Sequence, residues 1–356
     1  MNNRIEKFLR QAEKQPGFEG ALITDGKNRF YLFGMRSSAG TAVIFKDAAY
    51  FIIDFRYIEM AQKTVKNATV ILQDNLYKQI NELCAKHGVK NLWVENSMSV
   101  GTFNALSAKL EAKLEANGQL TKIVEDLRAI KDAGELEIIK VAQQITEAGF
   151  DYICTQLAPG KKERDMALEL ETFMKKNGAD GLSFDTILVS GKNSSLPHGV
   201  PGEKLIEKGD FVTMDYAAAY GGYCTDMTRT VAIGYATDEM KKVYDIVLKS
   251  QLMAIDAIKA GAVCSDIDKI ARDYIYSNGY EGCFGHGLGH SYGLEIHESP
   301  RLSPSDSSVL QEGVLMTVEP GIYLPDKFGV RIEDTVFVTK DGCVNLTHSP
   351  KELIII

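Results

Sequence analysis

The sequence predicts a two-domain protein of mixed α/β (α+β) class, with a smaller domain at residues 1–125 and a larger one at residues 126–356. Its 356 residues are enough for two hydrophobic cores. Residues 1 to about 125 alternate short strand-like runs with helical patterns, whereas the rest combines longer helical patterns with strand-rich segments. The 45% apolar and 25% charged residues are typical of a folded globular chain.

The expected strands of the first domain are short runs rich in β-branched and aromatic residues, bounded by Gly, Asp, Asn or Lys. They cover residues 20–24, 29–33, 41–45, 49–54, 69–72 and 91–95. Helical patterns lie at the N-terminus, near 77–87 and near 100–116. The N-terminal pattern is amphipathic, with one apolar face formed by Ile5, Phe8, Leu9 and Ala12.

The second domain begins within a long helical pattern that runs from about Val124 to Leu157. Further helices are expected at about 163–177, 237–259 and 265–278. Between and after them lie four strand-rich segments, at residues 183–190, 210–233, 281–300 and 313–338. These segments contain nearly all of the acidic residues and histidines whose spacing, described below, is unusual. We therefore expect the functional site there.

Charge and cysteine content exclude several classes of protein. Forty Lys and Arg against 48 Asp and Glu give a net charge of −8, which argues against nucleic acid as a partner. The sequence has no apolar run long enough to predict a membrane span. The N-terminal helical pattern lacks the apolar core of a signal peptide. The six cysteines have no C-x-x-C spacing, so we expect reduced thiols in a cytoplasmic protein, with Cys224 a small core residue.

Two expected hairpins each carry a pair of carboxylates. Residues 209–234 form a hairpin that turns at Ala219–Gly222, which would place Asp215 directly opposite Asp226 with Cβ atoms roughly 5 Å apart. Residues 313–338 form a second hairpin centred on Asp326, which would place Glu319 opposite Glu333.

Such pairs are costly on a core-like strand, because like charges repel and burial increases the penalty. A divalent metal ion would stabilise four clustered carboxylates, so the two hairpins predict a metal site. On the strand of Glu333, Arg331 and Thr335 share its face, where an arginine could orient a metal-binding carboxylate.

Four of the six histidines fall within one hundred residues, in segments that contain glycines or prolines. His286, His290 and His297 lie in 284–300, where the glycines disfavour a helix and favour an extended chain close to a crowded centre. The segment has neither the H-E-x-x-H pattern of a zinc protease nor a phosphate-binding glycine motif. His198 lies in a loop punctuated by Pro and Gly.

Several motifs resemble those of the pita-bread metallopeptidases, which include methionine aminopeptidases, aminopeptidase P, Xaa-Pro dipeptidase (prolidase) and the metal-free creatinases. The motifs are MDYAAAYGGYCTDMTRT, GHGLGHSYGLEIHESP, TVEPGIY and GVRIED, and SLPHGVP is similar to a histidine loop of the Xaa-Pro peptidases. The stretch NRFYLFGMRSSAGTAVIF resembles the creatinase-like N-terminal domain of that group. The resemblance therefore implies a pita-bread catalytic domain preceded by a smaller creatinase-like α/β domain.

The resemblance implies a dinuclear metal site in which no ligand is substituted. Asp215 would bind one ion, His290 and Glu319 the other, and Asp226 and Glu333 would bridge both. For the two divalent ions that the resemblance implies, oxygen ligands with a single imidazole favour Mn²⁺, with Co²⁺, Zn²⁺ or Fe²⁺ as alternatives.

The same resemblance assigns roles around the metals. Glu319 would also move a proton, and His198 and His297 would hydrogen-bond the scissile amide and the tetrahedral intermediate. His286 would line the proline side, Arg301 would contact a substrate carboxylate, and Arg331 would lie behind the metal ligands.

The expected function is a metal-dependent Xaa-Pro aminopeptidase, which hydrolyses the bond between an N-terminal residue and a following proline. The alternatives are a prolidase restricted to dipeptides, a methionyl aminopeptidase, a metal-free creatinase-like amidinohydrolase and an inactive binding relative. The expected partners are peptides with proline in second position and a second copy in a homodimer, but neither nucleic acid nor membrane.

Overall fold

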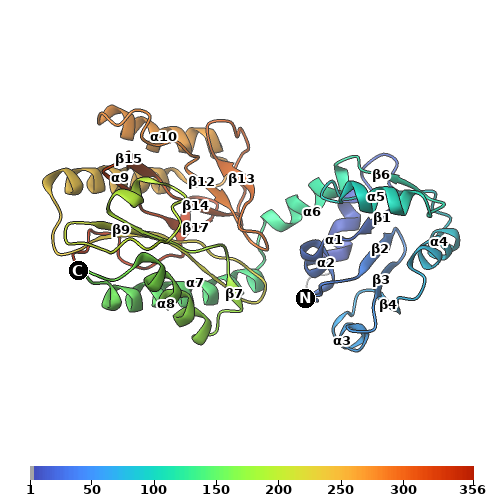
Figure 1. Cartoon of the computed structure of the whole chain (residues 1–356). Helices are drawn as coiled ribbons and strands as arrows, with labels where there is room; N and C mark the ends of the chain where they lie inside the picture. Colours follow the sequence, from blue (N-terminus) through green and yellow to red (C-terminus); the bar gives the residue numbers. More distant parts are fainter. Residues whose placement is uncertain (1–3) are drawn as a thin grey trace. The chain divides into compact units, whose positions relative to one another are not determined.

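The computed structural model describes residues 4–356, which divide into two compact units, one ending at Arg128 and the other covering Ala129–Ile356 (Figure 1). The domain boundary expected after residue 125 lies inside helix α6 (Gln119–Ala129). Each unit has its own hydrophobic core.

The first unit is built on a six-stranded mixed sheet with the strand order β4-β3-β2-β1-β5-β6. Neighbours β1/β2 and β2/β3 are antiparallel, whereas β3/β4, β1/β5 and β5/β6 are parallel. The strands are β1 (Gly20–Ile23), β2 (Thr41–Phe45), β3 (Ala49–Ile53), β4 (Thr69–Leu72), β5 (Asn91–Val94) and β6 (Lys113–Glu115). Five of the six expected strands are confirmed.

The helices of the first unit pack against this sheet and complete its core. They are α1 (Arg4–Ala12), α2 (Gly26–Phe33), α3 (Ile58–Thr64), α4 (Leu76–His87), α5 (Val100–Ser107) and α6. The amphipathic α1 is confirmed, because it buries Ile5, Phe8 and Ala12.

Three predicted elements are corrected. Residues 29–33 are helical rather than a strand, because Asp25 caps the N-terminus of α2 and Gly34 ends it with φ 75°. The helix expected over 100–116 ends at Ser107, and β6 follows at the sheet edge. The long helix expected from 124 to 157 is two helices, because Asp132 and Glu135 form a capping box that starts α7 (Ala133–Gln156).

The second unit places its strands between two pairs of helices. Figure 1 shows α7 and α8 (Glu163–Lys176) on one side of β9, β14 and β17, and α9 (Asp238–Ala257) and α10 (Cys264–Ser277) on the other. Separate apolar clusters fill the two sides. The strands are β7 (Gly181–Leu182), β8 (Ile187–Ser190), β9 (Phe211–Asp215), β10 (Ala218–Ala219), β11 (Thr228–Ala232), β12 (Gly289–Ser291), β13 (Glu298–Leu302), β14 (Leu315–Val318), β15 (Gly321–Leu324), β16 (Phe328–Arg331), β17 (Asp334–Val338) and β18 (Cys343–Asn345).

The hairpin of residues 313–338 has the predicted register. Val318 pairs with Asp334 in the β14/β17 ladder, and Gly321 pairs with Arg331 in the β15/β16 ladder. Glu319 and Glu333 therefore lie opposite each other in the short gap between the two ladders. The turn is centred on Asp326, whose φ of 60° lies in the left-handed region.

The hairpin of residues 209–234 differs from the prediction. Asp215 pairs with Thr228 rather than with Asp226, which precedes β11 by two residues. The turn is centred between Gly221 and Gly222, whose φ values of 59° and 89° suit a tight hairpin turn. This centre is one residue further along the chain than predicted, so the two aspartates are diagonal neighbours instead of a facing pair.

Gly289→Ala should destabilise the second unit, because a Cβ at Gly289 would lie 2.0 Å from the carbonyl oxygen of Thr317 and would push β12 away from β14. We expect a loss of about 1–3 kcal/mol in the free energy of unfolding, measured by urea denaturation with circular dichroism. The matched control is Gly342→Ala, where no atom lies within 4 Å of the added Cβ. Equal urea midpoints for the two variants would contradict this account.

Candidate metal centre

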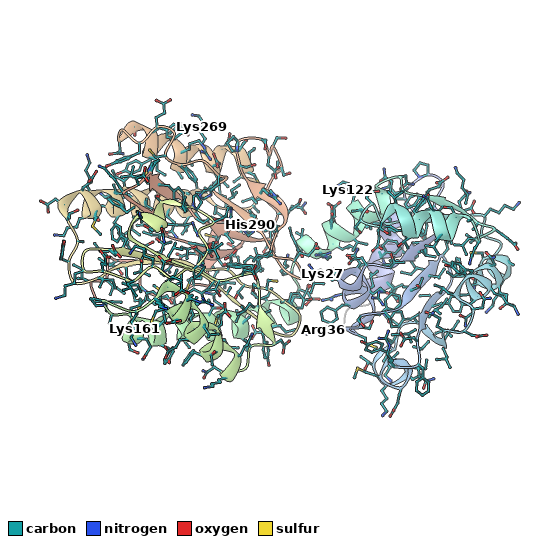
Figure 2. The ribbon with its side chains drawn as sticks, viewed as in Figure 1. Lys27, Arg36, Lys122, Lys161, Lys269 and His290 are labelled. Atoms are coloured by element: carbon teal, nitrogen blue, oxygen red, sulfur yellow. The ribbon has the colours of Figure 1, made fainter. Side chains whose placement is uncertain are left out.

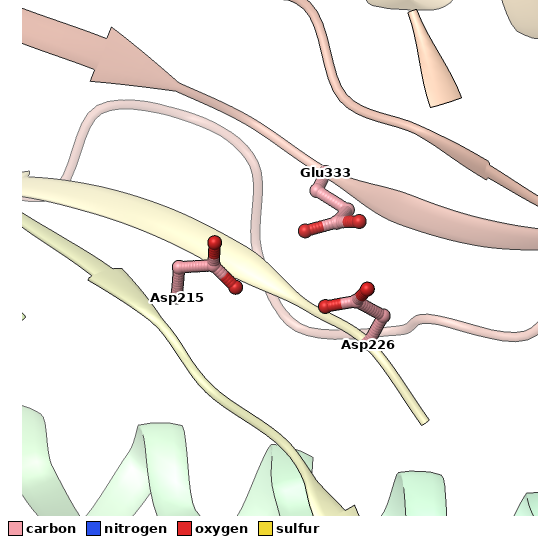
Figure 3. Close-up of side chains that lie close together, drawn as sticks. All are labelled: Asp215, Asp226 and Glu333. Carbon is pink, nitrogen blue, oxygen red and sulfur yellow. The ribbon is translucent and has the colours of Figure 1, made fainter. Parts of the chain in front are cut away.

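Three carboxylates converge in the second unit, from the end of β9, from the segment before β11 and from the gap between β16 and β17. One oxygen each of Asp215, Asp226 and Glu333 lies within 4.8 Å of the others. Figure 3 shows the three carboxylate groups pointing toward one another. Asp226 and Glu333 are 5% and 1% exposed, so this cluster of negative charge is largely removed from water.

His290 and Glu319 adjoin the three carboxylates. His290 Nε2 lies 3.5 Å from Asp226 Oδ2 and 3.4 Å from Glu319 Oε1. His290 lies on the extended strand β12 rather than on a helix, as predicted, and Figure 2 shows it among the strands of the second unit. Its backbone N–H donates to Thr317 Oγ1, and the Glu319 N–H donates to the Leu288 carbonyl, so β12 and β14 hold the two side chains side by side. All five residues expected to bind metal thus lie together.

Burial makes the charged forms of these carboxylates unfavourable. Burial, and then repulsion between the carboxylates, raises the pKa values of Asp226 and Glu333 well above their ordinary range. Burial also raises the pKa of Glu319 to about 8. The cluster therefore needs positive charge in order to remain ionised at neutral pH.

Unused ligand atoms show where such charge fits. Among the described residues, Asp215 Oδ1 and Glu333 Oε1 are buried and have no hydrogen-bond partner. The other oxygen of each is occupied: Arg331 Nη2 lies 2.5 Å from Asp215 Oδ2, and Thr228 Oγ1 donates to Glu333 Oε2 at 2.7 Å. Buried, unpaired carboxylate oxygens beside an imidazole form a donor set suited to divalent metal ions.

The tautomer of His290 also suits a metal ligand. Burial lowers its pKa to about 3, so the imidazole is neutral at pH 7. Its Nδ1 lies 3.1 Å from the Ser291 carbonyl oxygen, which can only accept, so Nδ1 carries the proton. The lone pair of Nε2 therefore points toward the carboxylates, as in histidines that ligate metals.

Arg331 connects the carboxylates to a histidine through Tyr323, which the sequence reasoning did not select. Arg331 Nη1 donates to the Tyr323 hydroxyl at 2.8 Å, and that oxygen lies 2.8 Å from His286 Nε2. Burial lowers the pKa of His286 to about 4, so this ring is also neutral. Tyr323 lies in the TVEPGIY motif, but nothing in its spacing distinguishes it from an ordinary core tyrosine. Thr335 is more remote, since its hydroxyl donates to the Asp226 carbonyl at 3.3 Å.

A cavity of about 790 Å³ opens onto the five residues and is also lined by His198, His286, His297 and Arg301. This volume is typical of a pocket for a small ligand. The His297 and His290 rings meet edge to face with centroids 4.5 Å apart, and burial followed by the charge of Arg301 lowers the pKa of His297. His198 and Arg301 are exposed side chains at this cavity. The apolar part of the wall, missed in the sequence, includes Phe184, Ile187, Ile296 and Val200.

Two other expectations concern the chain as a whole. All six cysteines are free thiols, and Cys224 is buried as expected. Within residues 4–356, no helix combines the length and the apolar character that crossing a membrane requires.

Removal of metal should make the stability depend on pH in a defined direction. Folding raises the carboxylate pKa values, that of Glu319 from 4.5 to about 8, so the folded metal-free chain retains protons that the unfolded chain releases. Stability should therefore fall between pH 6.5 and 8, by about 1.4 kcal/mol per pH unit for each retained proton. Below pH 6.5, the buried neutral histidines His286 and His290 act in the opposite direction.

Thermal unfolding with chelator and with Mn²⁺ at the two ends of this pH range measures the effect. The melting temperature in chelator should fall with pH, Mn²⁺ should restore more of it at pH 8, and Glu319→Gln should weaken the dependence. A chelated protein whose melting temperature is constant or rises over this range would contradict the charge account.

Models of two known protein domains match most of the chain. Residues 137–340 match the model of metallopeptidase family M24, and residues 4–130 match the creatinase/prolidase N-terminal domain. The chain is 45% identical to an uncharacterized peptidase, YqhT, of Bacillus subtilis, over 99% of this chain and 100% of that protein. It is 38% identical to the Xaa-Pro dipeptidase of Pyrococcus horikoshii, over 99% of both chains.

Solved structures have the same fold over both units. The Xaa-Pro dipeptidase from Bacillus anthracis superimposes with a TM-score of 0.95 at 41% identity, covering 99% of each chain. The X-Pro aminopeptidase from Thermotoga maritima has a TM-score of 0.90 at 35% identity, covering 97% of this chain and 99% of its own. The predicted family resemblance and the predicted fold are confirmed. The chain belongs to metallopeptidase family M24, with a pita-bread catalytic domain preceded by a creatinase-like N-terminal domain.

Proposed function

We propose that this metallopeptidase is a dinuclear exopeptidase that hydrolyses the bond between an N-terminal residue and a following proline. The observation that carries the proposal is the convergence of four carboxylates and a neutral imidazole, with unpaired buried oxygens, on one cavity. Asp215 would hold one ion, His290 and Glu319 the other, and Asp226 and Glu333 would contact both. The predominance of oxygen ligands favours Mn²⁺, with Co²⁺, Zn²⁺ and Fe²⁺ as alternatives.

Bound divalent ions supply a polarised substrate carbonyl and a coordinated water of lowered pKa. The residues of the chain orient the substrate and move protons. Glu319, beside His290 and open to the cavity, would carry a proton from the attacking water to the leaving nitrogen. His198 and His297 would donate hydrogen bonds to the scissile amide and to the oxygen that becomes negative in the tetrahedral intermediate.

Cleavage before proline requires a particular kind of recognition. The amide nitrogen of proline has no hydrogen, and its ring fixes φ, so an enzyme that reads an extended backbone by hydrogen bonds loses a contact. A site that grips the free amino terminus does not need that contact. His286 would line the proline side of the cavity, and Arg301, opposite His290 across the β12/β13 pair, would contact a substrate carboxylate.

The length limit of the substrate defines two versions of this function. Our primary assignment is an Xaa-Pro aminopeptidase that accepts longer peptides. The second is a prolidase restricted to dipeptides, which is favoured by the names of the Pyrococcus relative and the Bacillus anthracis structure. A homodimer remains a prediction from the family resemblance, and a cytoplasmic location remains a prediction from the cysteine pattern and the N-terminal sequence.

The direct experiment is to strip the protein with chelator, restore Mn²⁺ and assay Ala-Pro, Ala-Pro-Ala and, as a control, Met-Ala-Ser. Cleavage of the tripeptide at Ala–Pro supports the aminopeptidase, and cleavage of the dipeptide alone supports the prolidase. Release of methionine from the control alone would replace both with a methionyl aminopeptidase. Inactivity on all three substrates with Mn²⁺ and with the alternative ions would refute the proposed catalysis.

Asp226→Asn and Glu333→Gln should each abolish turnover, because each removes one carboxylate proposed to contact both ions. We expect a loss of at least ~10³-fold in kcat with an unchanged circular dichroism spectrum. Glu312→Gln, at an exposed glutamate of the same unit, is the charge-matched control and should retain wild-type activity. Substantial turnover in either ligand variant would rule out the two-metal assignment.

A further inference from the structure

Glu163 is a fully buried carboxylate that belongs neither to the carboxylate cluster nor to the cavity wall. It is the first residue of α8, and its side chain contacts the segment Ser190–Gly202, here called the His198 loop. A buried carboxylate is costly unless donors surround it, so its presence at this position calls for a physical reason.

The Glu163 carboxylate joins the two ends of the His198 loop. Oε1 accepts from the Ser190 N–H at 2.7 Å and from the Ser190 hydroxyl at 2.9 Å, at the start of the loop. Oε2 accepts from the Gly202 N–H at 3.2 Å, at the end of the loop. Asn193 Nδ2 lies 3.2 Å from both oxygens. One side chain thus hydrogen-bonds to the chain both before and after His198, the residue to which the family resemblance assigns a catalytic role.

The position of His198 depends on this loop rather than on contacts of its own. Among residues 4–356, no hydrogen-bond partner is found for its exposed imidazole, which lines the cavity. After a short 3-10 turn at Gly191–Ser195, the rest of the loop forms neither helix nor strand. Its middle is held by Arg331 Nη1, which donates to the Pro197 carbonyl at 3.3 Å. The ends are held by Glu163.

We propose that Glu163 is a positioning residue that holds His198 at its place on the cavity wall by fixing both ends of the loop. The inference rests on the proposed function, in which His198 hydrogen-bonds the substrate. A carboxylate has two accepting oxygens, whereas the amide of glutamine has one and adds an N–H₂ donor. Glu163→Gln therefore preserves the shape of the side chain but can satisfy only one end of the loop.

Kinetics of Glu163→Gln, with Mn²⁺ and whichever of Ala-Pro-Ala and Ala-Pro the wild type cleaves faster, test the proposal. We expect kcat to fall by roughly 10- to 100-fold, the scale of a small misplacement of a reacting group, while KM and the affinity for Mn²⁺ change less than about twofold. In a His198→Ala background, the same substitution should lower kcat by less than about twofold. Independent, multiplicative losses in the double variant would show that Glu163 does not act through His198 and would overturn the proposal.

The matched control is Glu203→Gln. Glu203 directly follows the loop, but it is exposed and pairs with Lys162 and Arg164 at the surface. This variant should keep the wild-type kcat, whereas a loss equal to that of Glu163→Gln would mean that any charge change near the loop impairs the enzyme. That result would also overturn the specific role of Glu163.

Hydrogen exchange gives a readout that needs no activity. In Glu163→Gln, peptides covering 188–204 should exchange at least about tenfold faster than in the wild type, because the Ser190 and Gly202 amides donate to Glu163. Peptides of β14 should be unchanged. If the wild type cleaves no Xaa-Pro peptide but exchange is faster in Glu163→Gln, the proposed function is wrong, whereas the role of Glu163 in fixing the loop is supported. If exchange of these peptides is unchanged in Glu163→Gln, Glu163 does not fix the loop, and the proposal is overturned even if the enzyme is active.

Discussion

The main physical constraint on the second unit is the repulsion between the carboxylates that are buried at its centre. Burial and mutual repulsion raise the pKa values of Asp226 and Glu333. The guanidinium of Arg331 hydrogen-bonds to Asp215 instead of to either of them. Such a cluster is unfavourable for the folded chain by itself, because buried like charges without compensation destabilise it. Divalent ions would resolve the conflict, since they would replace the missing positive charge and bind the oxygens that have no hydrogen-bond partner. The unfavourable burial of these charges would then favour metal binding.

Strands and helices around the carboxylate cluster position its side chains and those of the nearby histidines. Close contact between β12 and β14, possible only with Gly289 at the crossing, brings His290 against Glu319. The histidines that we assign to the substrate lie on loops, and charged side chains on helices hold two of those loops from behind. Glu163 holds the loop of His198, and the Asp268–Arg272 pair of α10 holds that of His286, because Arg272 donates to the His286 carbonyl at 2.7 Å. Rigid helices thus position groups on irregular backbone.

Much of this site could be predicted from the sequence because carboxylate spacing and hairpin register are local properties. The predicted register of Glu319 and Glu333 is confirmed, since the turn around Asp326 lies midway between them. The predicted register of the other hairpin is wrong by one residue, because the chain turns at Gly221–Gly222 rather than at Tyr220–Gly221. Residues 29–33 look like a strand by composition, and only the caps at the two ends of α2 show the helix. Tyr323 and Glu163 act through tertiary contacts that no local pattern records.

The number of metal ions bound per chain tests the central claim most directly. Metal analysis of the Mn²⁺-loaded protein after removal of free ions, combined with electron paramagnetic resonance, measures both stoichiometry and proximity. The account predicts two ions per chain and the spectrum of a spin-coupled pair, because Asp226 and Glu333 would contact both ions. A single ion per chain, or two ions without magnetic coupling, would contradict it.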